Sequence, residues 1–184
     1  MPDIRLSVNI ALRQLRDSRF VEWLLERLVL ADLPCDRLTL EIPEATLHET
    51  HGAIYDNVCR AGASGLSLGL DDFATGPTSL QTLRQQGVTA IHISRLFIHD
   101  IARDPNAACL VDAMIAMARS LNLVVIAKGI ESKDVACLLQ SQGCKFAQGY
   151  LFDEPMTAEA LATRLKRQQD SGATASAPAN LGKV

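Results

Sequence analysis

The segment LVVIAKGIESKDVACLLQSQG, residues 123–143, contains one complete strand–helix unit. Its first part, LVVIAKGI, is a short apolar run rich in β-branched residues, which is typical of a buried strand. Its second part starts at Ser132, a plausible N-cap, and carries apolar residues at helical spacing. Similar units precede and follow it, and such alternation predicts a parallel sheet covered by helices. Lys128 breaks the apolar pattern at the end of this strand.

The predicted units share one order, a strand followed by a helix. The strands are predicted at residues 4–10, 37–44, 66–73, 90–94, 123–130 and 146–152, and the helices at 19–33, 52–64, 78–87, 106–122, 132–143 and 157–168, with Thr157 as a further N-cap. Residues 170–184, DSGATASAPANLGKV, are small, polar and without pattern. We therefore predict a folded domain over residues 1–169 and a disordered tail over residues 170–184.

The composition is that of an ordinary globular protein. The 184 residues are 48% hydrophobic and 21% charged, with a net charge of −3. No basic field attracts a nucleic-acid polymer or an anionic membrane, and no apolar run is long enough to insert into a bilayer. The first residues lack the regions of a secretory signal, so a cytoplasmic location is expected.

The cysteines form no CxxC pair and are expected to be buried free thiols; they are Cys35, Cys59, Cys109, Cys137 and Cys144. Trp23, Met114 and Met117 fall at core spacing in predicted helices.

Polar residues collect where the predicted strands end. An open doubly wound sheet and a (β/α) barrel are both compatible with this order of units. No GxGxxG or Walker-type loop follows any strand, and the carboxyl ends of barrel strands are where active sites form, so the barrel is favoured. The polar strand-end residues are Asn9, Glu41, Asp71, Asp72, His92, Lys128 and Gln148.

These side chains would converge at the mouth of a barrel. Carboxylate and amide oxygens are the ligands preferred by Mg²⁺, Mn²⁺ and Ca²⁺. Asp71 and Asp72 are adjacent, so both can reach one site only where the strand ends. The loop that follows, ATGPTS at residues 74–79, would place a helix N-terminus near an anionic ligand such as a phosphate group.

Motifs in a fixed order resemble those of the EAL domain family of bacterial cyclic di-GMP phosphodiesterases and receptors. They cover residues 4 to about 165. The family has a modified (β/α)8 barrel with two divalent metal ions at its mouth, and it hydrolyses one phosphodiester bond of the cyclic dinucleotide. The motifs are SVNI (7–10), LEIPE (40–44), LDDFATG (70–76), AIHISRLF (90–97), VVIAKGIE (124–131) and FAQGYLF (146–152).

The resemblance also implies roles for individual residues. Asn9, Glu41 and Asp71 match metal-ligand positions, and Asp72 matches the position that helps to hold the second metal. Glu44 matches the glutamate that anchors the loop after the LDDF motif. Two further site positions of the family are matched by Glu131 and Gln148.

Other positions depart from the family pattern. The two opening strands of the family barrel, with one metal-binding glutamate, have no counterpart, which predicts a barrel lacking its first two strands. His92 replaces a lysine, Ser94 replaces an aspartate, and Lys128 replaces the glutamate implicated in positioning or deprotonating the attacking water. A protonated lysine accepts no proton and coordinates no metal. Lys128 could instead pair with Asp71 or Asp72 and occupy the place of a metal ion, or extend into solvent.

These departures predict a catalytically inactive EAL-like domain that acts as a binding or protein-interaction module in cyclic di-GMP signalling. No cofactor is expected in that case. The alternative is an active phosphodiesterase that uses Mg²⁺ or Mn²⁺, with the absent residues supplied by upstream sequence. An incomplete barrel would leave open sheet edges beside residues 4–10 and 146–152, where self-association or a protein partner is expected. Cyclic di-GMP is a possible ligand.

Overall fold

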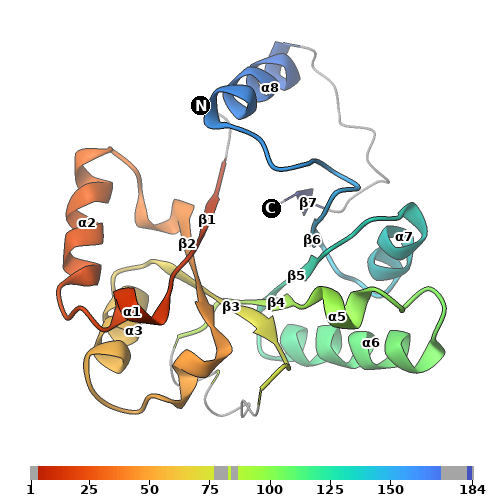
Figure 1. Cartoon of the computed structure of the whole chain (residues 1–184), viewed down its shortest axis with the longest axis horizontal. Coiled ribbons are helices and arrows are strands. Elements are labelled where there is room, and N and C mark those ends of the chain that lie inside the picture. The colour runs from red at the N-terminus through yellow and green to blue at the C-terminus, as the bar shows by residue number, and fades with distance from the viewer. Residues whose placement is uncertain (1–3, 77–82, 84–86, 171–181, 184) are drawn as a thin grey trace.

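The strands lie in one parallel sheet, in their order along the chain (Figure 1). The computed structural model describes residues 4–76, 83, 87–170 and 182–183. Each of the six predicted strands is present and hydrogen-bonds to its neighbour in sequence. The strands are β1 (Leu6–Asn9), β2 (Leu38–Pro43), β3 (Ser67–Phe73), β4 (Ala90–Ile93), β5 (Val124–Lys128), β6 (Phe146–Gln148) and the short β7 (Gly182–Lys183).

The sheet curls into part of a barrel, and helices lie along its outer side (Figure 1). This confirms the predicted incomplete (β/α) barrel. The helices are α1 (Leu12–Leu15), α2 (Phe20–Leu30), α3 (Ala53–Ala63), α5 (Arg95–Ile98), α6 (Pro105–Ser120), α7 (Lys133–Ser141) and α8 (Ala158–Asp170), with 3-10 turns η1 (Cys35–Arg37) and η2 (Glu44–His48).

Alternation along the strands separates an apolar outer face from an inner face that carries the polar groups of the strand ends. Residues at every second position of β2 to β5 are buried and join one hydrophobic core with Val58 of α3, Ile115 of α6 and Leu139 of α7. The positions between them lie on the concave side, where Ala90 and Ile126 are also buried and apolar. The outer-face residues are Leu40, Ile42, Leu68, Leu70, Ile91, Ile93, Val125 and Ala127.

Helix starts follow the predicted capping residues. The Ser132 side chain accepts a hydrogen bond from the Val135 N–H at 3.3 Å, and Thr157 Oγ1 accepts one from the Ala160 N–H at the same distance. The short helices α1 and α5 were not predicted, because four residues are too few to show helical periodicity. Most of the helix predicted at 78–87 lies outside the described residues.

The strand predicted at 146–152 is wrong beyond Gln148. The chain turns there, and the Phe152 N–H bonds to the Gly149 carbonyl at 3.0 Å. A Cβ at Gly149 would lie only 2.2 Å from the Ile130 carbonyl oxygen, so backbone packs directly on backbone at this point. The close approach requires a glycine at this position, directly after the strand ends.

The expectation that all cysteines and the helical Trp are buried is wrong. The five cysteines are free, but only Cys144 is buried, and Cys109 and Cys137 are exposed. Met114 is buried as predicted, whereas Trp23 is 52% exposed, with the Arg27 guanidinium 5.8 Å from its ring centre. Among the described residues, no helix has both the length and the apolar character needed to cross a bilayer.

The two ends of the sheet differ. β1 hydrogen-bonds only to β2 within the described residues, and Leu6 and Val8 are 45% and 44% exposed. The prediction of an open edge at β6 needs correction, because Gly182 and Lys183 pair with Phe146 and Ala147. The tail residues 171–181 and 184 lie outside the described residues.

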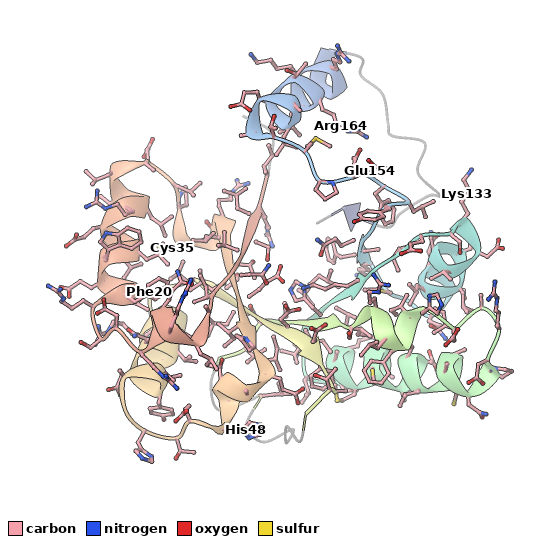
Figure 2. All side chains as sticks on the ribbon, viewed as in Figure 1. Phe20, Cys35, His48, Lys133, Glu154 and Arg164 are labelled. Atoms are coloured by element: carbon pink, nitrogen blue, oxygen red, sulfur yellow. The ribbon has the colours of Figure 1, made fainter. Side chains whose placement is uncertain are left out.

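Helix α8 stands apart from the other helices (Figure 1). Its described side chains are exposed apart from the half-buried Leu165. Arg164, labelled in Figure 2, pairs with Asp153 Oδ1 at 2.7 Å and ties the helix to the segment after β6. An apolar side chain on α8, Leu161, is 41% exposed. The helix therefore offers apolar surface beside the incomplete part of the barrel.

Candidate functional site

Four side chains from four neighbouring strands meet near the carboxyl ends of the sheet. Glu41 comes from β2, Asp71 from β3, His92 from β4 and Lys128 from β5. Sequence analysis had placed all four at strand ends, and the curl of the sheet brings them together on its concave side.

Lys128 binds both carboxylates of this group. Its Nζ donates to Asp71 Oδ1 at 2.5 Å and to Glu41 Oε2 at 2.8 Å. The predicted pair with Asp71 is therefore present, and the contact with Glu41 adds a partner that was not predicted. The side chains are 20% exposed for Lys128, 7% for Glu41 and 26% for Asp71. The ammonium group thus lies between two partly desolvated carboxylates, and it does not extend freely into solvent.

The two carboxylates keep Lys128 charged. Burial by itself lowers the pKa of Lys128, but the hydrogen bonds to Asp71 and Glu41 and the charges of both carboxylates outweigh it, so the pKa lies above its usual value. The side chain is therefore protonated at neutral pH. It offers no lone pair to a metal ion or a proton.

His92 is the most deeply buried member of the group, at 1% exposure. Its Nδ1 lies 3.6 Å from Glu41 Oε2, and neither ring nitrogen has a hydrogen-bond partner among the described residues. Burial lowers the pKa of His92; Glu41 opposes this effect, and Lys128 adds to it. The absence of a side chain at Gly69 leaves room for the ring, because a Cβ there would lie 2.8 Å from Nε2.

Ser7 is a member of the site that sequence analysis missed. Its Oγ donates to Glu41 Oε1 at 2.5 Å, so that each oxygen of Glu41 has a donor. Asn9 and Glu41 are paired across β1 and β2, and Ser7 lies two residues before Asn9 on the same face of its strand. This two-residue spacing was the available signal.

The other predicted site residues lie around these contacts. Asn9 is exposed beside Glu41, and Gln148 is exposed beside Lys128 in the sheet register. Asp72 has a φ of 47° and is exposed, and its backbone N–H donates to Asp71 Oδ1 at 2.8 Å. Two residues remain at the margin: Glu131 is exposed after β5, and Ser94 is buried at the start of α5.

The loop after β3 contacts Glu44. Glu44 Oε2 accepts a hydrogen bond from the Gly76 backbone N–H at 2.8 Å, and a Cβ on Gly76 would lie 3.2 Å from the carboxylate. Ala74 has a φ of 68°, in the region that favours glycine. The remainder of the predicted ATGPTS loop, residues 77–79, lies outside the described residues.

The group has two features that bear on metal binding. One ligand atom each from Glu41, Asp71 and His92 lie within 4.8 Å of one another, a spacing from which they could converge on a single cation. The same carboxylates already hold the Lys128 ammonium. A metal ion in this position would have to displace an internal cation.

Comparison with known proteins gives the relatives of the chain. It is 35% identical over 164 residues to cyclic di-GMP phosphodiesterase PA2567 of Pseudomonas aeruginosa, covering 89% of this chain and 28% of that protein. The chain thus spans less than a third of the length of this curated relative. The phosphodiesterase PaMucR, in its c-di-GMP complex, superposes with a TM-score of 0.79 at 32% identity, covering 85% of this chain and 64% of that one.

A further solved structure and the family pattern agree with this relationship. The EAL domain of Mycobacterium smegmatis DcpA superposes with a TM-score of 0.82 at 29% identity, covering 89% of this chain and 74% of that chain. The pattern described as EAL domain matches residues 1–155. These residues include every strand end that contributes to the site. The chain belongs to the EAL domain family.

Proposed function

We propose that this EAL domain binds a ligand or a protein in cyclic di-GMP signalling without hydrolysing the dinucleotide. The observation that supports this function is the position of Lys128, whose ammonium group holds Glu41 and Asp71. Both carboxylates match metal-ligand positions of the family. The residues present therefore fit an internal cation better than the hard metal ions of an active phosphodiesterase.

The loss of chemistry follows from the charges of the side chains. In active members, metal ions activate a water molecule and stabilise the charge that develops on the phosphate. Lys128 replaces the family glutamate that would accept a proton from this water, and a protonated amine cannot do so. Ser94 replaces a further carboxylate, so the site lacks two anionic groups that would attract divalent cations.

The alternative function is an active metal-dependent phosphodiesterase. It is supported by the clustering of Glu41, Asp71 and His92 donor atoms within 4.8 Å. The description of PA2567 as a cyclic di-GMP phosphodiesterase supports it as well. This function requires that Lys128 leave the site when metal binds and that upstream sequence supply the remaining ligand.

Cyclic di-GMP is the proposed small-molecule ligand, because PaMucR binds it in a structure that shares this fold. A protein partner is proposed at the outer edge of β1, which has no further strand beside it in the described part of the chain and exposes Leu6 and Val8. A complete barrel of this type has eight strand–helix units, and this chain supplies six, so two additional units would complete it, whether from upstream sequence or from another chain. We place this module in the cytoplasm.

One experiment separates these functions. The protein is incubated with cyclic di-GMP and Mn²⁺, and bound dinucleotide and linear product are measured in the same samples. Binding without product identifies a receptor, and neither binding nor product identifies an interaction scaffold. Product formation would overturn the proposal and favour the phosphodiesterase. Light scattering after size-exclusion chromatography tests partner closure, because a stable monodisperse monomer contradicts self-association at β1.

A further inference from the structure

We propose that Glu41, Asp71 and His92 bind one borderline transition ion of the Zn²⁺ or Co²⁺ class in competition with the Lys128 ammonium. This inference deepens the proposed function and rests on it, since it assumes that Lys128 disfavours Mg²⁺ at the same carboxylates. The proposed site differs in donor chemistry from the oxygen-ligand set implied for active family members. It is a single-ion site with a nitrogen ligand.

The buried ring of His92 has no hydrogen-bond partner in the described part of the protein. The side chain is 1% exposed, and neither Nδ1 nor Nε2 has a hydrogen-bond partner among the described residues. Buried polar groups are almost always paired, because losing hydration without a new bond is costly. Nδ1 lies 3.6 Å from Glu41 Oε2, too long for a hydrogen bond but well placed for two ligands that share an ion. A metal ion would satisfy this nitrogen.

The site already holds a cation, the Lys128 ammonium group. Lys128 Nζ lies within 2.8 Å of one oxygen from each carboxylate. Ligand atoms bound to Zn²⁺ lie about 2.0–2.2 Å from the metal, so the three donors, which lie within 4.8 Å of one another, would have to move closer together around the ion. The Lys128 side chain is 20% exposed and has a flexible stem, so its ammonium can leave the site for solvent.

The donor atoms of the site favour one class of metal ion. Imidazole nitrogen binds Zn²⁺, Co²⁺ and Ni²⁺ well, whereas Mg²⁺ requires oxygen ligands and retains its waters. Ser7 donates to the Glu41 oxygen that Lys128 does not contact, and such a bond orients a ligating carboxylate. The mixture of one imidazole and two oriented carboxylates therefore selects transition ions over Mg²⁺.

Cobalt titration of the whole chain tests the site. Co²⁺ bound to nitrogen and oxygen ligands is followed by visible absorbance, and its affinity is measured by calorimetry. We expect His92→Asn to weaken Co²⁺ binding by about tenfold or more and to alter the absorbance bands. Lys128→Met, which removes the competing charge, is expected to tighten binding by at least about tenfold. His99→Asn is the matched control, because His99 is an exposed histidine near Asp100, and it should change neither.

The outcomes are distinct. Equal Co²⁺ binding by the wild-type protein and His92→Asn overturns the site, as does Mg²⁺ competing at the affinity of Co²⁺. If Lys128→Met does not fold, as judged by circular dichroism, the comparison of wild type with His92→Asn still decides. Cyclic di-GMP hydrolysis is assayed separately with Mn²⁺. Hydrolysis of the dinucleotide would overturn the proposed function. Co²⁺ binding that does not depend on His92 would overturn only the proposed transition-ion site.

Discussion

Replacement of Lys128 by Met tests how strongly the internal cation stabilises the fold. The substitution retains most of the apolar stem and removes only the charge. It leaves Glu41, whose side chain is 7% exposed, and Asp71, which is 26% exposed, as neighbouring anions without a counter-ion. Another side chain of the group that could carry a positive charge is the imidazole of His92, which lies 3.6 Å from Glu41, but its burial disfavours the cation by lowering its pKa.

The expected loss of stability follows from this exposure. Removing one member of a buried ion pair costs about 3–5 kcal/mol. Because Lys128 is 20% exposed and Asp71 26% exposed, water can screen part of the uncompensated charge, and we expect about 2–4 kcal/mol. The pKa of Lys128 is raised above 10.5, so this contribution is fully present at pH 7 and is lost as the pH rises through the raised value.

Urea denaturation at pH 7, followed by circular dichroism, gives the change in the free energy of unfolding. Lys133→Met is the matched control, since Lys133 is exposed at the start of α7, and it should change stability by less than about 0.5 kcal/mol. The double variant Lys128→Met/Glu41→Gln should be more stable than additivity predicts, because it removes a buried charge together with its partner. If the free energy of unfolding of Lys128→Met lies within about 0.5 kcal/mol of the wild-type value, the internal ion pair does not stabilise the protein to the expected extent.

Three other predictions concern the titration of His92, the space around two glycines and the N-cap of α6. The lowered pKa of His92 means that the unfolded chain binds more protons below pH 6.5, so wild-type stability should fall with decreasing pH from that point. For each unit by which the pH falls, the free energy of unfolding of His92→Gln should decrease by up to about 1.4 kcal/mol less than that of the wild type. Urea denaturation between pH 7.5 and 5.5 measures both, and an identical pH dependence in the two proteins would contradict this prediction. Gly69→Ala should destabilise by roughly 1–3 kcal/mol, because its Cβ would lie 2.8 Å from His92 Nε2 and 3.2 Å from Thr39 Cγ2. Gly62→Ala in α3 should instead stabilise the protein by about 0.5–1 kcal/mol, because its Cβ would meet only Leu68 at 3.9 Å. Equal melting temperatures for the Gly69 and Gly62 variants would contradict the steric argument. Asp104→Ala should cost about 1 kcal/mol by removing the cap that accepts from the Asn106 N–H at 2.8 Å, and an unchanged melting temperature would contradict it.

The sequence was sufficient to predict the sheet but not all of its contacts. The positions of the strands and helices follow from periodicity, which reports the side of each element that is buried, whereas the arrangement of the strands was predicted from the polar strand ends and the family resemblance. The choice between Asp71 and Asp72 as the partner of Lys128 depended on a local irregularity. The register of β3 against β4 shifts between Leu70 and Phe73, and Asp72 takes a φ of 47°. No pattern in the residues fixes that shift, so the alternatives stayed open.

Two other features needed three-dimensional structure for a related reason. Glu41 is 87 residues from Lys128, and only the curl of the sheet determines that one ammonium reaches both β2 and β3. In the sequence, Gly69 cannot be distinguished from any other glycine in a strand, yet the absence of a side chain there leaves the space that the His92 ring occupies. The exposure of Trp23 was mispredicted, because helical spacing identifies an apolar stripe without showing what covers it.

The central claim is that the Lys128 ammonium occupies the position at which active family members hold a hard metal ion. Calorimetric titration of the wild-type protein with Mg²⁺ tests this most directly. Because Lys128 Nζ is bound to Glu41 and Asp71, we predict no saturable, stoichiometric heat of Mg²⁺ binding. Tight binding of one or two Mg²⁺ ions per chain would contradict the claim.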